Sequence, residues 1–485
     1  MSPTASQTVI DVLTRLEHEE PNLAPRLQAI RERIEGPLRV AIAGRVKAGK
    51  STLLNALVGE RLAPTDAGEC TKLVSWYRKG PTYEVSAHRS NGIDTPLTFQ
   101  RRDGALDVQL GGLSEDDVAW LDVHWPSSAL DDITLIDTPG LASLHDENSR
   151  RTRDFLDHDT GGGSDADAVI YLMRHVHKDD IAFLDAFMDR SVAAASPVNA
   201  VAVLSRADEI GAGRLDAMDS ATRIARRYEA DPQVRALCAT VTPMAGLLAE
   251  TGLTLREEEV ANLRALAATD PEVLELMLLS TEHFFELTSS SLTVEIRRDL
   301  LDRLGIYGVR IALREIGAGA TTAAQLGPRL VEVSGLGALR TIITQHFMPR
   351  ARILQARTAL TSLRHLAREL AATDPKTATA IDREAERIES SAVEFAQLRA
   401  SHLVASGAVA VTEAERADLG RLLLASSGAV ALGLEGSSPE AVREAALAGV
   451  SRWRNRAADP LADPALAEVC ETAARSCEAI YVAST

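Results

Sequence analysis

Aromatic residues are scarce in this chain: they make up 4% of its 485 residues, although hydrophobic residues together reach 45%. That combination provides enough apolar surface for a core but favours long helices of alanine and leucine over sheet-rich folds. The chain is also too long for one compact domain. We therefore expect two domains, or one domain with an extended helical part.

Cysteines and long apolar runs are also few. Four cysteines occur, and none has the spacing of a metal or redox motif: Cys70, Cys238, Cys470 and Cys477. This usage is typical of a reducing cytoplasm. Residues 1–5 lack a basic start followed by an apolar core, so no signal peptide is predicted. The longest uncharged apolar stretch, 422–434, is too short to span a bilayer, so any membrane contact is expected to be peripheral.

A basic excess is absent as well. The chain has 52 Lys and Arg against 69 Asp and Glu, which gives a formal net charge of −17. Nucleic-acid binding needs a basic face that neutralises phosphates, so we expect no nucleic-acid partner. The same charge argues against attraction of the whole surface to anionic lipid.

What the chain does contain is a phosphate-binding loop. Residues 44–51 match the pattern GxxxxGK[ST] and lie between an apolar run at 38–43 and a helix-like segment at 52–58. Backbone N–H groups at such a loop and helix start form a cradle for a di- or triphosphate. We expect Lys50 to reach the β- and γ-phosphates and Ser51 to ligate Mg²⁺. The predicted phosphate-binding residues are Gly44, Arg45, Val46, Lys47, Ala48, Gly49, Lys50, Ser51 and Thr52.

A second motif follows downstream, where an apolar strand at 133–136 ends in Asp137-Thr138-Pro139-Gly140. An acidic residue at the tip of a strand beside the phosphate loop can hold Mg²⁺ through water, so we assign Asp137 to the metal site. The Gly140 N–H can bond the γ-phosphate and lose that bond on hydrolysis, as a switch loop does. The metal also needs a threonine from the loop between the two motifs. Of Thr65 and Thr71, we choose Thr71 because it lies at a loop-to-strand junction.

Base recognition is assigned to the end of a third apolar strand, at 198–204. There the sequence Ser205-Arg206-Ala207-Asp208 offers a carboxylate that can accept from guanine N1–H and N2–H₂, a donor pair that adenine lacks. Ser205 can bond locally, and the Arg206 stem and guanidinium can cover the base. A further strand is predicted over 236–241, followed by Thr242-Pro243-Met244-Ala245-Gly246.

The remaining sequence is predicted to be helical. Two helices before the phosphate loop are separated at Pro21 and end at Gly36-Pro37, and the chain from about 253 onward shows helix periodicity. Apolar residues spaced four and three apart form a seam over 356–370, and five arginines lie on its other faces between 350 and 368. We interpret the seam and the apolar stretches 403–411 and 422–434 as bundle core, with lipid contact as the alternative.

These motifs together resemble the bacterial dynamin-like GTPases, and most of all the isoniazid-inducible dynamin-like proteins of actinobacteria. The resemblance rests on 46–57, 63–71, the DTPG motif and 204–208, and it covers residues 38–246. It implies a Ras-like, dynamin-type α/β GTPase domain with an all-α helical-bundle neck or stalk. Two positions depart from the family: SRAD replaces the commoner TKAD, and Lys47 stands where eukaryotic dynamins have serine. We divide the chain into N-terminal helices packing on the stalk (1–36), a GTPase domain (37–345) and the stalk (346–485).

Lys47 is the strongest candidate for a catalytic side chain. No glutamine follows DTPG, so a residue of the type that orients water in Ras-like enzymes is missing. A cation inside the loop can instead stabilise charge on the transferred phosphoryl group. A solvated loop lysine is the alternative interpretation. The predicted catalytic residues are Lys47, Lys50 and Thr71, with Mg²⁺ held by Ser51, Thr71 and Asp137.

Two functions are left open by the sequence. The first is a GTPase that hydrolyses GTP to GDP and phosphate, with hydrolysis driving pairing of GTPase domains and membrane remodelling. The second is a slow switch or scaffold that binds a membrane-associated partner protein instead of lipid. The resemblance implies self-association through the GTPase face, and pairing with a paralogous dynamin-like protein is the alternative. The expected location is the cytoplasm, including the inner face of the cell membrane as a peripheral protein.

Overall fold

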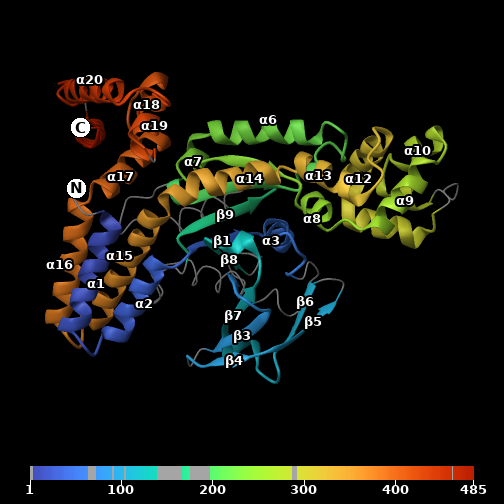
Figure 1. Cartoon of the computed structure of the whole chain (residues 1–485), viewed down its shortest axis with the longest axis horizontal. Helices are drawn as coiled ribbons and strands as arrows, with labels where there is room; N and C mark the ends of the chain where they lie inside the picture. Colours follow the sequence, from blue (N-terminus) through green and yellow to red (C-terminus); the bar gives the residue numbers. More distant parts are fainter. Residues whose placement is uncertain are drawn as a thin grey trace.

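The structure is a computed structural model, and it describes residues 4–63, 73–89, 92–102, 105–138, 166–174, 197–286, 292–425, 427–460 and 463–484. Thr71 and Gly140, two of the predicted site residues, lie outside these ranges. The described part is elongated (Figure 1). A central sheet separates a helical bundle at one end, which holds α1, from a second group of helices at the other end, which holds α10.

Within the described residues, the central sheet has nine strands in the order β11-β10-β9-β1-β8-β2-β7-β3-β4. The strands from β11 to β8 are parallel, β2 is antiparallel to β8 and parallel to β7, and β3 and β4 continue antiparallel. Their bounds are β1 Leu38–Gly44, β2 Ser75–Lys79, β3 Glu84–Arg89, β4 Asp94–Pro96, β7 Val118–Trp125, β8 Ile133–Asp137, β9 Ala168–Met173, β10 Ala200–Ser205 and β11 Val241–Met244. A separate hairpin pairs β5 (Thr98–Arg102) with β6 (Ala105–Gln109).

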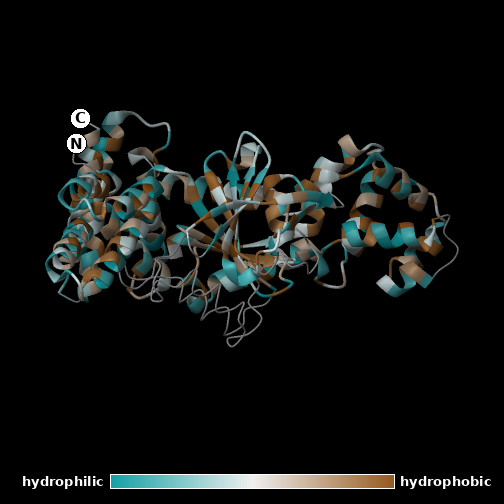
Figure 2. Ribbon diagram, turned by 90° about the horizontal axis from the view of Figure 1, so that it is seen from below, coloured by the Kyte–Doolittle hydropathy of each residue, from teal (hydrophilic) through white to brown (hydrophobic). Residues whose placement is uncertain are grey.

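The parallel strands are apolar along nearly their whole length because helices cover both faces of the sheet. One face packs against α3 (Lys50–Val58), α8 (Gly246–Thr254) and α14 (Leu336–Ile342). The other face packs against α6 (Ala217–Ala230) and α7 (Pro232–Arg235). Figure 2 shows the hydrophobic residues of the central strands, with hydrophilic and hydrophobic residues alternating along the outer helices. The fold therefore places the carboxyl ends of β1, β8, β9 and β10 at one edge, where the predicted motifs lie.

Helices inserted after the sheet form their own hydrophobic cluster beside it. α8 contributes Leu248 and α6 contributes Ala217 to this cluster, and most of its other members come from the helices that follow. Their bounds are α9 Glu257–Ala267, α10 Pro271–Met277, α11 Thr281–Glu286, α12 Val294–Gly317 and α13 Ala323–Val333. Gly305 interrupts the α12 dihedrals with φ 63° and ψ 173°, which divides the helix at a kink. The chain then returns to the sheet through α14.

The N-terminal helices pack far from their neighbours in sequence. α1 (Ala5–Glu19) and α2 (Ala24–Glu35) share one core with α15 (Ala351–Leu370) and α16 (Pro375–Ser391). The predicted seam supplies much of this core, since Ala356, Leu360 and Leu363 are fully buried. The interpretation of the seam as bundle core is therefore confirmed.

The arginines around the seam are held by protein groups. Arg352 donates to the Ile34 main-chain oxygen at 2.5 Å, and Arg364 donates to Glu389 at 2.6 Å. Arg357 is buried. These contacts favour a structural role for the arginines over a lipid-binding stripe.

The last helices form another cluster at the top of Figure 1. They are α17 Val393–Ser406, α18 Glu413–Leu424, α19 Gly428–Ala431, α20 Pro439–Ala457 and α21 Pro464–Ala483. The stretches 403–411 and 422–434 contribute Val404, Val409 and Leu423 to its core. Within the described part of the chain, every helix is too short or too polar to cross a lipid bilayer.

One detail of the sequence prediction needs revision. The strand predicted over 236–241 begins only at Val241, because Asp231 caps α7 at Pro232 and a helical turn continues to residue 238. The helices α9–α13, within the predicted GTPase range 37–345, agree with the helix periodicity expected from about residue 253 onward, but the sequence did not indicate their separate hydrophobic cluster. The proposed boundaries fall between α2 and β1, and inside the π-helical turn Ile343–Phe347; as domain limits they stay predictions.

Candidate nucleotide-binding site

The loop between β1 and α3 has the backbone of a phosphate cradle. Gly44 has φ 149° and Gly49 has φ 94°, and a Cβ at Gly44 would lie 2.5 Å from the Leu172 main-chain oxygen. Both positions therefore need glycine. α3 begins directly after Gly49, so the free N–H groups of its first turn point into the loop.

Lys50 lies across the mouth of this loop. Its Nζ donates to the main-chain oxygens of Gly44 and Arg45, at 3.3 Å each. Burial lowers the pKa of Lys50, and the charge of Asp137 opposes that shift. A buried ammonium that among the described residues donates to two carbonyls is poised to exchange those bonds for charged phosphate oxygens.

Asp137 ends β8 beside the first turn of α3. Its Oδ2 accepts a hydrogen bond of 3.2 Å from Ser51 Oγ, while Oδ1 is buried and has no hydrogen-bond partner among the described residues. Burial raises the pKa of Asp137 to about 6 against the opposing effects of Lys50 and Ser51. A hydroxyl and a carboxylate with a free buried oxygen form a donor set that suits Mg²⁺. Ser51 and Asp137 therefore fit the predicted metal site.

Asp208 lies in the base-recognition motif and lines a cavity of about 180 Å³. Only 8% of Asp208 is exposed, and burial raises its pKa to about 6; Glu209 adds to this effect, while Arg206 and Arg174 oppose it. The same cavity reaches Gly49 and Thr52 of the phosphate loop. One continuous space therefore joins the predicted guanine carboxylate to the predicted phosphate cradle.

Ser205 and Arg206 connect this motif to its neighbours. Ser205 Oγ donates to the Met173 main-chain oxygen at 3.3 Å, which ties the end of β10 to β9. Arg206 Nη2 donates to the Lys47 main-chain oxygen at 2.9 Å. Arg206 and Lys47 both have left-handed backbones, with φ 52° and 61°. The Lys47 side chain itself is exposed at the loop tip.

The structure thus brings together the loop 44–52, Asp137 and the motif 205–208. It adds wall residues that were not assigned to the site, including Leu172, Met244, Gly246 and Leu247. Met244 and Gly246 belong to the sequence Thr242–Gly246 that follows the predicted strand at 236–241. Leu172 had no signal, because only the pairing of β9 with β1 brings it to the loop.

Comparison with known proteins agrees with this geometry. The family model described as "Dynamin family" matches residues 40–183. The isoniazid-induced protein IniC of Mycobacterium tuberculosis is 39% identical over 460 residues, which cover 94% of this chain and 92% of that protein. The chain belongs to the dynamin family. Members of this family are GTPases, and the dynamin fold accounts for the sheet with its helical stalk.

Two further relatives are more distant. A bacterial dynamin-like protein of Nostoc punctiforme is 30% identical over 151 residues, covering 29% of this chain and 21% of that protein. A solved structure of an oligomerised bacterial dynamin pair aligns at 14% identity and a TM-score of 0.30, covering 93% of this chain and 61% of that one. The membership of this chain in the dynamin family rests on the full-length relative.

Proposed function

We propose that this dynamin-family chain binds GTP with Mg²⁺ and hydrolyses it to GDP and phosphate. The observation that carries the proposal is the continuous cavity from Asp208 to Gly49 and Thr52. Its lining runs from a carboxylate suited to a base to the loop that would take the polyphosphate. A buried carboxylate at one end selects guanine, and an amide cradle with a buried lysine at the other end selects phosphate.

The metal site of this proposal consists of Ser51 and Asp137, joined by Thr71, which lies outside the described residues. The buried Oδ1 of Asp137 supports it: it has no hydrogen-bond partner in the described part of the chain, and such an oxygen is costly unless a ligand completes it. Bound there, Mg²⁺ would offset charge on the β- and γ-phosphates. Lys50 would share that task from the opposite side of the loop.

Hydrolysis is assigned to Lys47 acting in cis. Its left-handed backbone is costly for a residue with a side chain, by about 1–3 kcal/mol, and such strain is common at functional sites. The exposed ammonium at the loop tip is free to approach the transferred phosphoryl group. A cation placed there stabilises the transition state more than the ground state.

The helical stalk is proposed to move with the nucleotide cycle. Arg340 on α14 donates to the main-chain oxygens of Ala56 and Leu57, at 3.2 Å and 3.3 Å, at the end of α3. α14 leads directly through the π-helical turn into the stalk helix α15. Movement of α3 would therefore be transmitted to the stalk. We propose that this coupling serves pairing of GTPase domains and membrane remodelling by a cytoplasmic protein that lies at the inner face of the membrane.

A second candidate is a slow switch that binds a membrane-associated protein. The core positions of the candidate lipid segments favour it: Val404 and Val409 are buried in the last helical cluster. In this function the nucleotide state selects a protein partner, either a second copy or a paralogous dynamin-like chain. GTP turnover would then be slow and would not respond to lipid.

One experiment separates the two candidates. The purified chain is sedimented with liposomes of anionic and of neutral lipid, with GTP and with GDP, and its GTPase rate is measured in each mixture. Binding to liposomes together with lipid-stimulated hydrolysis supports membrane remodelling. GTP-dependent association with protein but not with liposomes supports the switch. Absence of saturable Mg²⁺–GTP binding, or preference for ATP, contradicts both.

A further inference from the structure

Three consecutive strand ends meet in a small charged network beside the phosphate loop. β10, β9 and β1 are neighbours in the sheet, and each is followed by one participant: Arg206 after β10, Arg174 after β9 and Lys47 after β1. Glu209 lies between the two arginines. Neither Glu209 nor Arg174 belongs to a nucleotide-binding motif.

Glu209 uses its two oxygens for two different guanidinium groups. Oε1 accepts from Arg206 Nη1 at 2.8 Å, and Oε2 accepts from Arg174 Nη2 at 2.5 Å. Both terminal nitrogens of Arg206 therefore donate a hydrogen bond, because Nη1 bonds Glu209 and Nη2 bonds the Lys47 main-chain oxygen. The planar guanidinium holds these two bonds in a fixed relation.

The network also lies between two cavities. Arg206 and Glu209 line the base cavity of about 180 Å³ and a second cavity of about 530 Å³ that reaches Arg45 and Val46. A nucleotide base entering the first cavity must pass against the Arg206 stem. A shift of that stem would change the hydrogen bond from Arg206 to the Lys47 main-chain oxygen. The left-handed backbone of Lys47 persists only while neighbouring groups hold it.

We propose that Glu209 and Arg174 are positioning residues for GTP hydrolysis: they hold Arg206 so that it fixes the Lys47 main chain and orients the lysine toward the phosphates. This inference rests on the proposed GTPase function. It makes Arg206 a link between base recognition and the catalytic loop, in addition to a cover for the base. Glu209 touches no substrate in this scheme and acts through Arg206.

The expected effects are moderate, since the ion pairs are partly exposed. The side chains of Arg174, Arg206 and Glu209 are 47%, 38% and 51% exposed. Exposed pairs contribute little individually, so we expect Glu209→Ala to lower kcat about fivefold and to change KM for GTP by less than about twofold. Glu209→Gln keeps an acceptor for Arg206, so we expect its kcat to be close to that of the wild type.

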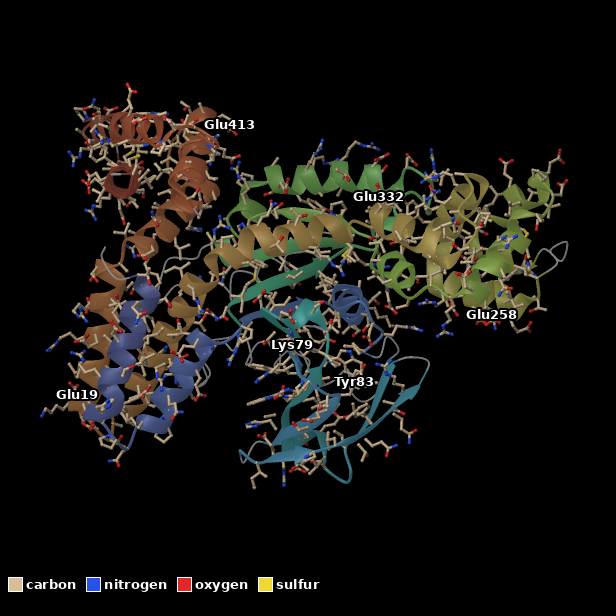
Figure 3. All side chains as sticks on the ribbon, in the orientation of Figure 1. Glu19, Lys79, Tyr83, Glu258, Glu332 and Glu413 are labelled. Atoms are coloured by element: carbon tan, nitrogen blue, oxygen red, sulfur yellow. The ribbon has the colours of Figure 1, made fainter. Side chains whose placement is uncertain are left out.

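The test is a double-mutant cycle on the full-length chain with Arg206→Ala, Glu209→Ala and the double variant, measuring kcat, KM and the release rate of a fluorescent GDP. If Glu209 acts through Arg206, its removal has no further effect on kcat once Arg206 is gone. Arg174→Ala should resemble Glu209→Ala in direction. The matched control is Glu258→Ala on α9, an exposed glutamate on the helical group at one end of the molecule (Figure 3).

The outcomes separate this inference from the function on which it rests. Multiplicative losses in the double variant, or a loss confined to KM, overturn the positioning role while leaving the GTPase intact. If the wild-type chain binds GTP but its turnover is too slow to compare, the GDP release rates are used instead. The effect of Glu209→Ala on the release rate should then be present in the wild type and absent once Arg206 has been replaced. A wild-type chain without affinity for GTP contradicts the proposed function itself.

Discussion

Ser51 Oγ donates to Asp137 Oδ2 across 3.2 Å, so the first turn of α3 and the tip of β8 are already joined without a ligand. The two groups come from motifs 86 positions apart in sequence. Parallel pairing of β1 with β8 brings them together, since Ile42 lies opposite Asp137. When Mg²⁺ binds, Ser51 and Asp137 would hold the metal in place of this hydrogen bond.

From this contact we predict that Ser51→Ala weakens Mg²⁺-dependent nucleotide binding by about tenfold or more, in the range seen when metal-site partners are lost. A Mg²⁺ titration of fluorescent GTP binding measures it. Ser451→Ala, an exposed helical serine on α20, is the control that should leave the titration unchanged. Equal Mg²⁺ dependence of GTP binding in Ser51→Ala and in the wild type would contradict the assignment of Ser51 to the metal site.

Lys47→Ala is predicted to separate binding from hydrolysis. The exposed side chain leaves the loop amides and Lys50 intact, so GTP affinity should change by less than about threefold. Loss of a cation at the phosphoryl group should lower kcat by about 10²–10³-fold. Single-turnover hydrolysis and equilibrium GTP binding measure the two quantities, with Lys376→Ala on α16 as the exposed control. Unchanged turnover would support the alternative that Lys47 is a solvated loop residue.

The sequence was sufficient to locate these groups where a local motif coincides with the end of a strand. The loop 44–51, Asp137 and Asp208 each follow an apolar run, and the carboxyl ends of adjacent parallel strands lie at one edge of a sheet. Glu209 and Arg174 carry no such signal. Their importance depends on β10, β9 and β1 being neighbours, and strand order is not encoded in any single segment.

Local reasoning also failed where two tendencies competed. Residues 236–241 include Leu237, Cys238 and Val241, an apolar pattern that suits a strand. The Asp231-Pro232 helix start overrides that pattern, and Leu237 and Cys238 are buried at the end of the helical turn instead. The helices α9–α13 were predicted as helices, but their separate core could not be foreseen, because amphipathic helices do not specify their partners.

The affinity for GTP should fall as the pH is lowered through about 6, because binding requires the ionised Asp208 carboxylate. Burial raises the pKa of Asp208 to about 6 in the unliganded protein, so the protonated form dominates below that value. We expect Kd to rise by up to about tenfold per pH unit below 6, and to be nearly constant between pH 7 and 8. Binding is measured with fluorescent GDP from pH 5 to 8.

Asp208→Asn supplies the control for this profile, because the nucleotide phosphates titrate in the same range and affect both proteins alike. The ratio of the two affinities isolates the effect of the Asp208 carboxylate.

The stability of the protein gives an independent check on the Asp208 pKa. A raised folded-state pKa means that the native protein binds more protons than the unfolded chain between about 4 and 6, so the free energy of unfolding falls as pH rises through that window. Burial raises the pKa of Asp137 to about 6 as well, so Asp208→Asn should remove only the Asp208 share of this fall and be the more stable protein at pH 8 without nucleotide.

Arg340→Ala is predicted to uncouple the movement of the stalk from the nucleotide state while leaving GTP binding nearly unchanged. Arg340 donates to the main-chain oxygens of Ala56 and Leu57 at the carboxyl end of α3, the end opposite the phosphate cradle. The helix dipole places negative partial charge there, so the guanidinium satisfies two carbonyls that α3 cannot bond itself. Removing it should leave GTP affinity within about threefold of wild type and weaken the link to α14.

The measurement that decides is the response of the stalk. A spectroscopic pair, with one label on α6 and one on α16, should change its distance between the GDP and the GTP-analogue states in the wild-type chain and change much less in Arg340→Ala. Arg329→Ala serves as the control, because Arg329 bonds Glu315 within the helical group and does not touch α3. If Arg340→Ala transmits the full change, the stalk is driven through another contact, of which the hydrogen bond between His346 Nε2 and the Val198 main-chain oxygen is the next to test.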